Sequence, residues 1–329
     1  MRAGASRLPF RPLRRSMSGM DEHNSPGRGA IWAGMLSIYI VWGSSYIGNS
    51  LAVQTIPPFL MTGIRNLIAG AVLYGARRLA GDAAPTPRNW KSAFIVGILM
   101  LGGGSGLVAW SQRIVPTGIA ALIIGSVPLW MTALDMLGGE KSRHHRPTPT
   151  ASLGILFGFG GILLLVGPAE LVGLEREVDP AGAVALLAGA FFWALGSLKS
   201  REAVFPDSRL LGTAMQLLGG GAGLLLIGTA AGEWRWFDPS LMSGRSILAL
   251  AYLVLFGSLV GFTVYTWLLK TAPTTLVATY AYVNPVVAIV LGLVFMGETL
   301  SPRTAAASIV VLVSVAAVTI GGKSRSRSS

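Results

Sequence analysis

The feature that most constrains this chain is a succession of long apolar stretches separated by short polar breaks. A hydrocarbon core about 30 Å thick requires about 20 apolar helical residues to cross it, and stretches of that kind recur between residues 31 and 320. Only 12% of the residues are charged, whereas an average soluble domain has about 25%. We therefore expect an all-α integral membrane protein.

Ten transmembrane helices are expected. They lie at residues 31–53, 58–75, 93–110, 117–137, 151–166, 181–198, 210–231, 247–269, 274–296 and 305–320. The breaks at 111–116 and 270–273 are short and contain proline, so each predicts a tight turn between antiparallel helices. A membrane β-barrel is excluded, because its strands would be about ten residues long and would alternate between apolar and polar residues, which these stretches do not.

The positions of Lys and Arg predict the orientation, because short cytoplasmic loops retain basic residues. With the N-terminus in the cytoplasm, 20 of the 26 basic residues fall on the cytoplasmic side and five on the other, and Arg65 lies inside a span. Both termini are then cytoplasmic, as an even number of spans requires. This topology explains the net charge of +12, so nucleic acid is not an expected partner.

Polar tails flank the apolar region. Residues 1–29 are basic and are expected to form a disordered cytoplasmic tail, with Met17 and Met20 as alternative starts. Arg14 and Arg15 are not followed directly by an apolar stretch, so the first span is expected to be a retained helix and not a cleaved signal. Residues 323–329 are expected to form a second cytoplasmic tail.

Catalytic chemistry finds little support. The chain has no cysteine, and His23, His144 and His145 all lie outside the expected spans. A membrane enzyme would need a nucleophile with its base, or a cluster of metal ligands, whereas the spans offer only Asp135 and Glu298 near their ends. We expect no catalytic residues, no metal site and no cofactor; a membrane-embedded enzyme or scaffold subunit is the most distant alternative.

The two halves of the chain resemble each other in sequence. Trp42 matches Trp193 at an offset of 151 residues, and Pro128 matches Pro285 at an offset of 157. Each half contains five expected spans, an odd number, so the second half must be inverted relative to the first. Residues 30–170 and 171–322 are therefore expected to be two inverted five-helix repeats, with a substrate site near the midplane at their interface.

Several short motifs, in a fixed order, resemble a known family. They are Trp42-Gly43-Ser44-Ser45, Ile56-Pro57-Pro58 with Arg65, Trp193-Ala194-Leu195-Gly196-Ser197, and Tyr282-Val283-Asn284-Pro285-Val286 with Gly297-Glu298. With these motifs the chain resembles the EamA-type proteins of the drug/metabolite transporter superfamily, over nearly all of residues 30–322. The resemblance implies ten helices, cytoplasmic termini and the export of small metabolites, including amino acids, across a cell membrane, which in a bacterium is the inner membrane.

Other branches of that superfamily exchange phosphorylated or nucleotide-linked sugars. Such anions call for several buried Lys or Arg residues, whereas only Arg65 lies within an expected span. We therefore expect an exporter or facilitator of small metabolites, with amino acids first, that works by alternating access; the sugar exchanger is the alternative. The expected partners are the small-molecule substrate and the lipid bilayer, and one chain can form the whole pathway as a monomer.

Polar groups in the middle of the spans mark the expected site, because they are costly in a bilayer unless they are paired or line a wet cavity. Ser126, Ser197 and Ser258 lie in this zone. The expected substrate-binding residues are Trp42, Ser44, Ser45, Tyr46, Asn49, Arg65, Asn66, Ser105, Trp193, Gln216, Tyr280, Tyr282 and Asn284. Serines in membrane helices also allow close helix packing, so each serine has that alternative role.

Other residues are assigned to gating, coupling or structure. Trp42 and Trp193 are expected to wall the cavity from opposite sides. Arg65 either holds a substrate carboxylate or pairs with a carboxylate such as Asp135 or Glu298, and the structural or gating role is preferred. Those two carboxylates are also the candidates for proton coupling, although a facilitator without coupling fits equally well. Two prolines either kink their helices for gating or shape the packing: Pro128 and Pro285.

Overall fold

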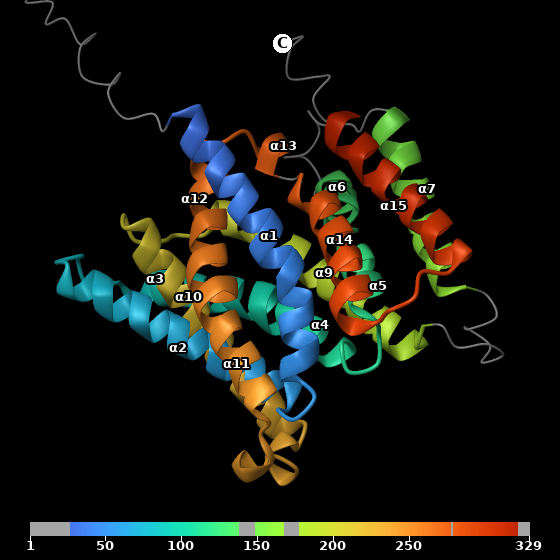
Figure 1. The fold of residues 1–329 in the computed structure, drawn as a ribbon. Helices are drawn as coiled ribbons and strands as arrows, with labels where there is room; N and C mark the ends of the chain where they lie inside the picture. Colours follow the sequence, from blue (N-terminus) through green and yellow to red (C-terminus); the bar gives the residue numbers. More distant parts are fainter. Residues whose placement is uncertain (1–26, 138–148, 168–177, 278, 322–329) are drawn as a thin grey trace, which may run out of the picture.

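The computed structural model describes residues 27–137, 149–167, 178–277 and 279–321, and within these ranges every regular element is a helix (Figure 1). The first half contains α1 (Arg28–Ala52), α2 (Pro58–Leu79), α3 (Pro87–Gly97), η1 (Ile98–Ser105), α4 (Gly106–Ser111), α5 (Thr117–Ile124), α6 (Val127–Leu137) and α7 (Pro149–Val166). Residues 1–26 of the expected N-terminal tail, the whole expected C-terminal tail and all three histidines lie outside the described residues. Arg28 and Gly29, the last two residues of the expected N-terminal tail, already belong to α1.

The second half repeats this order. It contains α9 (Pro180–Glu202), α10 (Arg209–Ala230), η3 (Glu233–Arg235), η4 (Pro239–Leu241), α11 (Gly244–Tyr252), η5 (Leu253–Phe262), α12 (Thr263–Thr271), α13 (Thr274–Val277), α14 (Tyr280–Leu291), η6 (Gly292–Met296) and α15 (Pro302–Gly321). Eight helical stretches in the described ranges are long and apolar enough to cross a membrane. Two shorter apolar helices, Ser152–Val166 and Tyr280–Met296, lie at the fifth and ninth expected spans. The all-α membrane architecture is therefore confirmed.

The fourth expected span is not one helix. Residues 117–137 form α5 and α6, which are separated at Gly125 and Ser126. Pro128 is the second residue of α6, a first-turn position where the missing N–H costs nothing. Pro128 therefore follows a break in this span, whereas Pro285 lies inside α14; that either proline acts in gating stays a prediction.

The third expected span of each half contains a π-helical segment. These segments are η1 in the first half and η5 in the second, and they overlap when the chain is compared with itself at the offset of 157. Segments of this kind are rare and frequently occur at functional sites. The two halves therefore share a local distortion as well as an order of helices.

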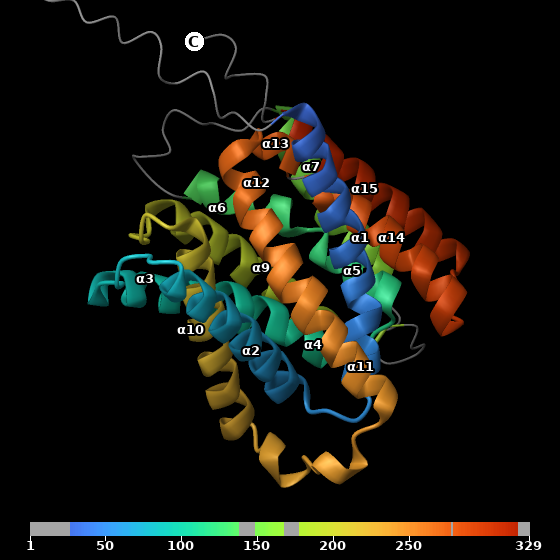
Figure 2. The same cartoon turned by 60° about the vertical axis from the view of Figure 1, so that its left-hand side comes forward.

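Helix packing has the same pattern in both halves. Among the described helices, α2 packs on α10 and α7 packs on α15, so equivalent helices pair directly; α7 and α15 lie side by side in both views (Figures 1 and 2). Helix α1 packs on α14 and η5, and α9 packs on α5, α6 and η1. Exchanging the halves thus maps the contacts of α1 with α14 and η5 onto those of α9 with α6 and η1, and maps the α2–α10 and α7–α15 contacts onto themselves.

Glycines allow α10 to approach α2 and α3 closely. A Cβ atom on Gly220 would lie 2.7 Å from the carbonyl oxygen of Gly97 and 2.7 Å from the Cβ atom of Leu101. A backbone oxygen cannot move away as a flexible side chain can, so only glycine fits here without shifting a helix.

We expect Gly220→Ala to lower the free energy of unfolding by about 1–3 kcal/mol, the usual cost of overpacking, as measured by thermal unfolding in detergent. Gly75→Ala is the matched control, because a Cβ atom on Gly75 meets nothing within 4 Å. Alanine also favours helix over glycine by up to about 1 kcal/mol, so this control should unfold at the same or a higher temperature. Equal unfolding temperatures for both variants would contradict the close approach.

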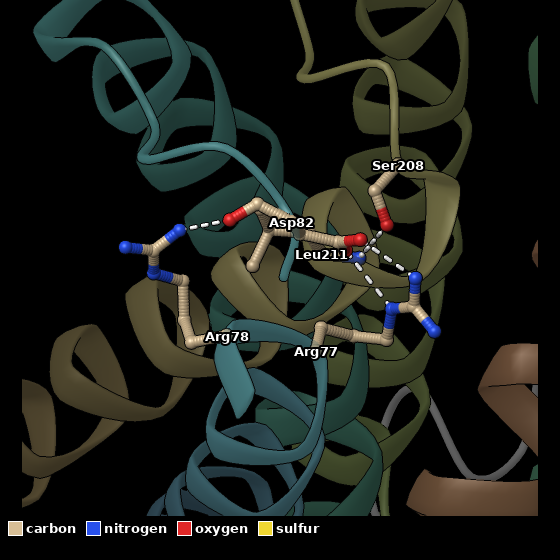
Figure 3. A network of polar contacts seen from close by, with 5 residues as sticks. All are labelled: Arg77, Arg78, Asp82, Ser208 and Leu211. Atoms are coloured by element: carbon tan, nitrogen blue, oxygen red, sulfur yellow. Dashed lines mark hydrogen bonds and ion pairs between the residues drawn. The ribbon is translucent and has the colours of Figure 1, made fainter. Parts of the chain in front are cut away.

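The two halves also meet at the loop between α2 and α3 (Figure 3). Asp82 accepts hydrogen bonds from Nε (2.9 Å) and Nη2 (2.6 Å) of Arg77, and Arg78 donates to the Asp82 carbonyl oxygen. The hydrogen bonds from Arg77 are the main cause of the lowered pKa of the Asp82 carboxyl group, and Ser208 lowers this pKa further. Ser208, which caps α10 by accepting from the Leu211 N–H at 3.4 Å, thus lies close to an acidic residue of the first half.

Candidate functional site

A cavity of about 120 Å³ lies at the centre of the bundle, and both halves line it. From the first half, its walls are formed by Trp42, Ser45, Tyr46, Asn49, Arg65, Asn66, Leu101, Gly104, Ser105, Val108, Ile124 and Val127. From the second half, they are formed by Gly189, Trp193, Leu217, Gly257, Ser258, Phe262, Tyr280 and Asn284. The π-helical segments in the third span of each half both reach the cavity, since Ser105 belongs to η1 and Ser258 to η5.

Most of the residues expected from the sequence lie around this cavity. Three of them do not line it: Ser44, Gln216 and Tyr282. Ser44 shares a hydrogen bond of 2.6 Å with the Tyr252 hydroxyl and donates to the Ile40 carbonyl oxygen, so it joins helices. Gln216 is buried and donates to the carbonyl oxygen of Gly212, one turn earlier in α10. The ten that line the cavity are Trp42, Ser45, Tyr46, Asn49, Arg65, Asn66, Ser105, Trp193, Tyr280 and Asn284; that they bind substrate stays a prediction.

Trp42 and Trp193 do not face each other across the cavity, as the sequence led us to expect. Their rings meet edge to face with centroids 5.9 Å apart, and Tyr265 and Tyr280 complete what we term the aromatic cluster. Trp42 is its centre, with ring centroids 4.8 Å from Tyr265 and 5.3 Å from Tyr280. The expectation of opposite walls is wrong because both indole rings turn into one contact.

Two glycines make room for these indoles. A Cβ atom on Gly104 would lie 2.9 Å from Trp193, and one on Gly261 would lie 2.5 Å from Nε1 of Trp42. Each tryptophan thus packs on a glycine of the other half, and the two glycines match at the offset of 157. The aromatic cluster continues into a buried apolar cluster with Met35 on α1, so it fills the bundle between the cavity and the N-terminal end of α1.

Polar side chains form another part of the cavity lining. Arg65 donates from Nη1 to Oδ1 of Asn49 at 3.1 Å, and Ser258 donates to Oδ1 of Asn66 at 3.1 Å. Buried atoms without a hydrogen-bond partner among the described residues include Nε of Arg65, Nδ2 of Asn66 and Oδ1 of Asn284. Such atoms are costly when left unsatisfied, so the cavity offers a polar ligand two free donors and one free acceptor.

The carboxylates expected to serve in coupling lie away from the cavity lining. Asp135 lies 3.9 Å from Arg201, and both side chains are about half exposed, at 52% and 53%. Glu298 accepts hydrogen bonds from the backbone N–H groups of Thr117 (2.6 Å) and Gly118 (3.2 Å) and from the Thr117 hydroxyl. Glu298 thus caps the N-terminus of α5, where unpaired N–H groups attract a negative charge.

Glu233 caps the N-terminus of α2 in the same way, and it was not among the residues expected from the sequence. This buried side chain accepts from the backbone N–H groups of Phe59 (3.2 Å) and Leu60 (2.8 Å). Burial raises the pKa of Glu233, although these two hydrogen bonds act in the opposite direction. Glu233 belongs to η3, outside the expected spans, and only polar residues inside spans were considered from the sequence.

Tyr265 and the glycines of the site were also missed. The Gly104 and Gly261 pair is visible when the chain is compared with itself, but a glycine match means little in a chain with 43 glycines. Tyr265 lies in the eighth span, where its contact with Trp42 depends on the packing of two helices that are far apart in the sequence.

Apolar helices of membrane-spanning length around a central cavity with aromatic and polar walls are typical of a multi-pass membrane protein. The EamA-like transporter family matches the chain twice, at residues 27–167 and 180–320. The chain therefore belongs to the EamA-like transporter family, with two family repeats.

Individual relatives agree with this assignment. The chain is 36% identical over 292 residues to the inner membrane transporter YedA of Escherichia coli strain K12, covering 88% of this chain and 91% of that protein. It is 25% identical to the protein PecM of Dickeya dadantii, covering 79% and 82% of the two chains. A solved crystal structure with 22% identity has the same fold, with a TM-score of 0.60 over 89% of this chain and 98% of its own. The protein is thus a multi-pass membrane protein of a transporter family.

Proposed function

We propose that this protein exports small metabolites, amino acids first, by alternating access through the central cavity. The observation that carries the proposal is the cavity itself, which takes residues from both halves and combines an aromatic cluster with unsatisfied polar atoms. A site at the interface of two similar halves can be opened to either side when the halves rock against each other.

Ten spans and inverted repeats are part of this proposal. Eight helical stretches are long and apolar enough to cross a membrane, and two shorter apolar helices lie at the other two expected spans, which supports ten crossings. Five crossings in each half would require the second half to be inverted. The exchange of helix contacts between the halves supports a two-fold relation between them. Residues 30–170 and 171–322 are the proposed repeats.

The size and charge of the cavity favour a small metabolite over a sugar phosphate. A volume of about 120 Å³ is comparable to the engineered protein cavity of about 150 Å³ that binds benzene. Arg65 is the only cation among the lining residues, whereas a phosphorylated sugar calls for several. Because Asp135 and Glu298 do not line the cavity, we further propose that the protein works as a facilitator without a proton passing through the site.

A counterflow panel in proteoliposomes tests the proposed function. Amino acids, sugars, sugar phosphates and nucleotides are offered one by one, with and without a pH gradient. Accelerated exchange of amino acids that does not depend on the pH gradient is the expected result. Exchange of sugar phosphates without amino acids would favour the alternative substrate class, and no exchange of any solute would overturn the transport proposal.

The proposed orientation predicts which loops are accessible from outside the cell. The chain has no cysteine, so single cysteines can be added without removing any. We expect Arg235→Cys, at an exposed position between α10 and α11, to react with an impermeant maleimide in intact cells. The matched variant Ala84→Cys, at an exposed position between α2 and α3, should react only after permeabilisation. The reverse pattern would place both termini outside the cytoplasm.

A further inference from the structure

We propose that Arg65 and Asn66 form a carboxylate-binding subsite, so that the solute carries one free carboxylate group. This inference rests on the proposed function, because it concerns the chemistry of the same cavity. It also goes against the structural role that the sequence favoured for Arg65.

Arg65 has no acidic partner within the part of the chain that the structure describes. Asp135 lies beside Arg201, and Glu298 is bound to the N-terminus of α5. No Asp or Glu lines the cavity. A guanidinium group stays protonated in proteins, so a positive charge stands in the centre of the bundle with only the neutral amide of Asn49 against it.

The unsatisfied hydrogen-bond donors of Arg65 and Asn66 are buried. Arg65 is 7% exposed and Asn66 is fully buried, and both line the cavity. Nε of Arg65 and Nδ2 of Asn66 have no hydrogen-bond partner in the described ranges. An uncompensated charge at membrane depth costs several kcal/mol, so an anionic group on the solute would relieve a penalty that the empty site carries.

The charge and hydrogen-bond geometry of this subsite distinguish a carboxylate from a phosphate. A carboxylate has one charge and accepts hydrogen bonds from arginine side on, which matches one guanidinium with a free Nε beside one amide donor. A phosphate monoester carries close to two charges at neutral pH and would leave one of them without a cation. The subsite therefore fits a monocarboxylate and does not fit a phosphate.

Other lining residues offer different chemistry to the rest of the solute. Trp42, Trp193 and Tyr280 present aromatic rings to the cavity, and Oδ1 of Asn284 is a buried acceptor without a donor. An ammonium group is attracted to aromatic rings and to a carbonyl oxygen, and an apolar side chain packs on the same rings. A zwitterionic amino acid therefore matches both kinds of chemistry in this cavity.

Ligand-induced thermal stabilisation of the purified full-length protein tests the subsite. The probes are L-leucine, L-phenylalanine and benzoate, each compared with its amide, together with glucose 6-phosphate. We expect at least one free carboxylate to stabilise the wild type, with its amide about 10- to 100-fold weaker, as expected for the loss of a hydrogen bond to a charged group. This comparison needs no variant, so it stands even if a substitution at Arg65 prevents folding.

Three variants complete the test. Arg65→Gln should abolish the difference between carboxylate and amide, and Arg65→Lys should retain part of it. Arg245→Gln, which removes an arginine at an exposed position, should behave as the wild type. Equal binding of acid and amide by the wild type, undiminished carboxylate binding by Arg65→Gln, tighter binding of glucose 6-phosphate, or no binding of any carboxylate would each overturn the subsite. The transport proposal fails separately, when counterflow moves no solute.

Discussion

Trp42→Ala is expected to abolish solute exchange and to lower the free energy of unfolding by about 3 kcal/mol. Trp42 touches three aromatic rings, those of Trp193, Tyr265 and Tyr280, and such pairs contribute about 0.5–1.5 kcal/mol each beyond their buried area. Removing the indole also leaves an unfilled space beside the cavity, and large-to-small substitutions cost more when the site cannot collapse. Counterflow in proteoliposomes and thermal unfolding in detergent measure the two effects.

Trp32→Ala is the matched control, because it removes the same side chain from the same helix at a position that is 52% exposed. Substitutions at such positions usually change stability by less than about 0.5 kcal/mol, and exchange should persist. Full activity of Trp42→Ala at wild-type stability would show that the aromatic cluster neither supports the bundle nor bounds the pathway.

Glu298→Ala is expected to lower the free energy of unfolding by about 2 kcal/mol and to slow exchange. The carboxylate satisfies two backbone N–H groups and one hydroxyl at the start of α5, and losing a helix cap costs about 0.5–2 kcal/mol. The effect reaches the site because Ile124, at the other end of α5, lines the cavity. Glu298→Gln keeps an acceptor but loses the charge, so its stability should be intermediate.

Glu202→Ala, at an exposed position near the end of α9, is the control and should match the wild type. A wild-type unfolding temperature for Glu298→Ala would rule out the capping role. If Glu298→Gln were fully stable but changed the response of exchange to a pH gradient, Glu298 would be a coupling residue, contrary to the facilitator proposal.

The membrane architecture could be predicted from the sequence because it depends on local properties of the sequence. An apolar stretch of sufficient length predicts a helix wherever it lies, and polar residues at its middle must be satisfied by something. Ten of the expected residues line the cavity for this reason, including Tyr280 and Asn284, which are four residues apart and share a helix face.

Features that depend on contacts between segments far apart in the sequence could not be predicted from the sequence. The edge-to-face contact of Trp42 with Trp193 depends on how far Gly104 and Gly261 let the helices approach. Gln216 matches Arg65 in the repeat, yet it bonds to its own helix and leaves Arg65 without an equivalent in the cavity. Similar sequence positions thus acquired different partners, and no pattern along the chain distinguishes them.

The central claim, that the cavity between the two halves holds the transported solute, can be tested by substrate protection of a single cysteine. Ser105→Cys places a thiol on the cavity wall of a chain that has no other cysteine. In proteoliposomes that still exchange solute, saturating amounts of that solute should slow its reaction with a small neutral thiosulfonate about tenfold, whereas a solute that is not exchanged should have no effect. Reaction at the same rate with and without the exchanged solute would contradict the claim.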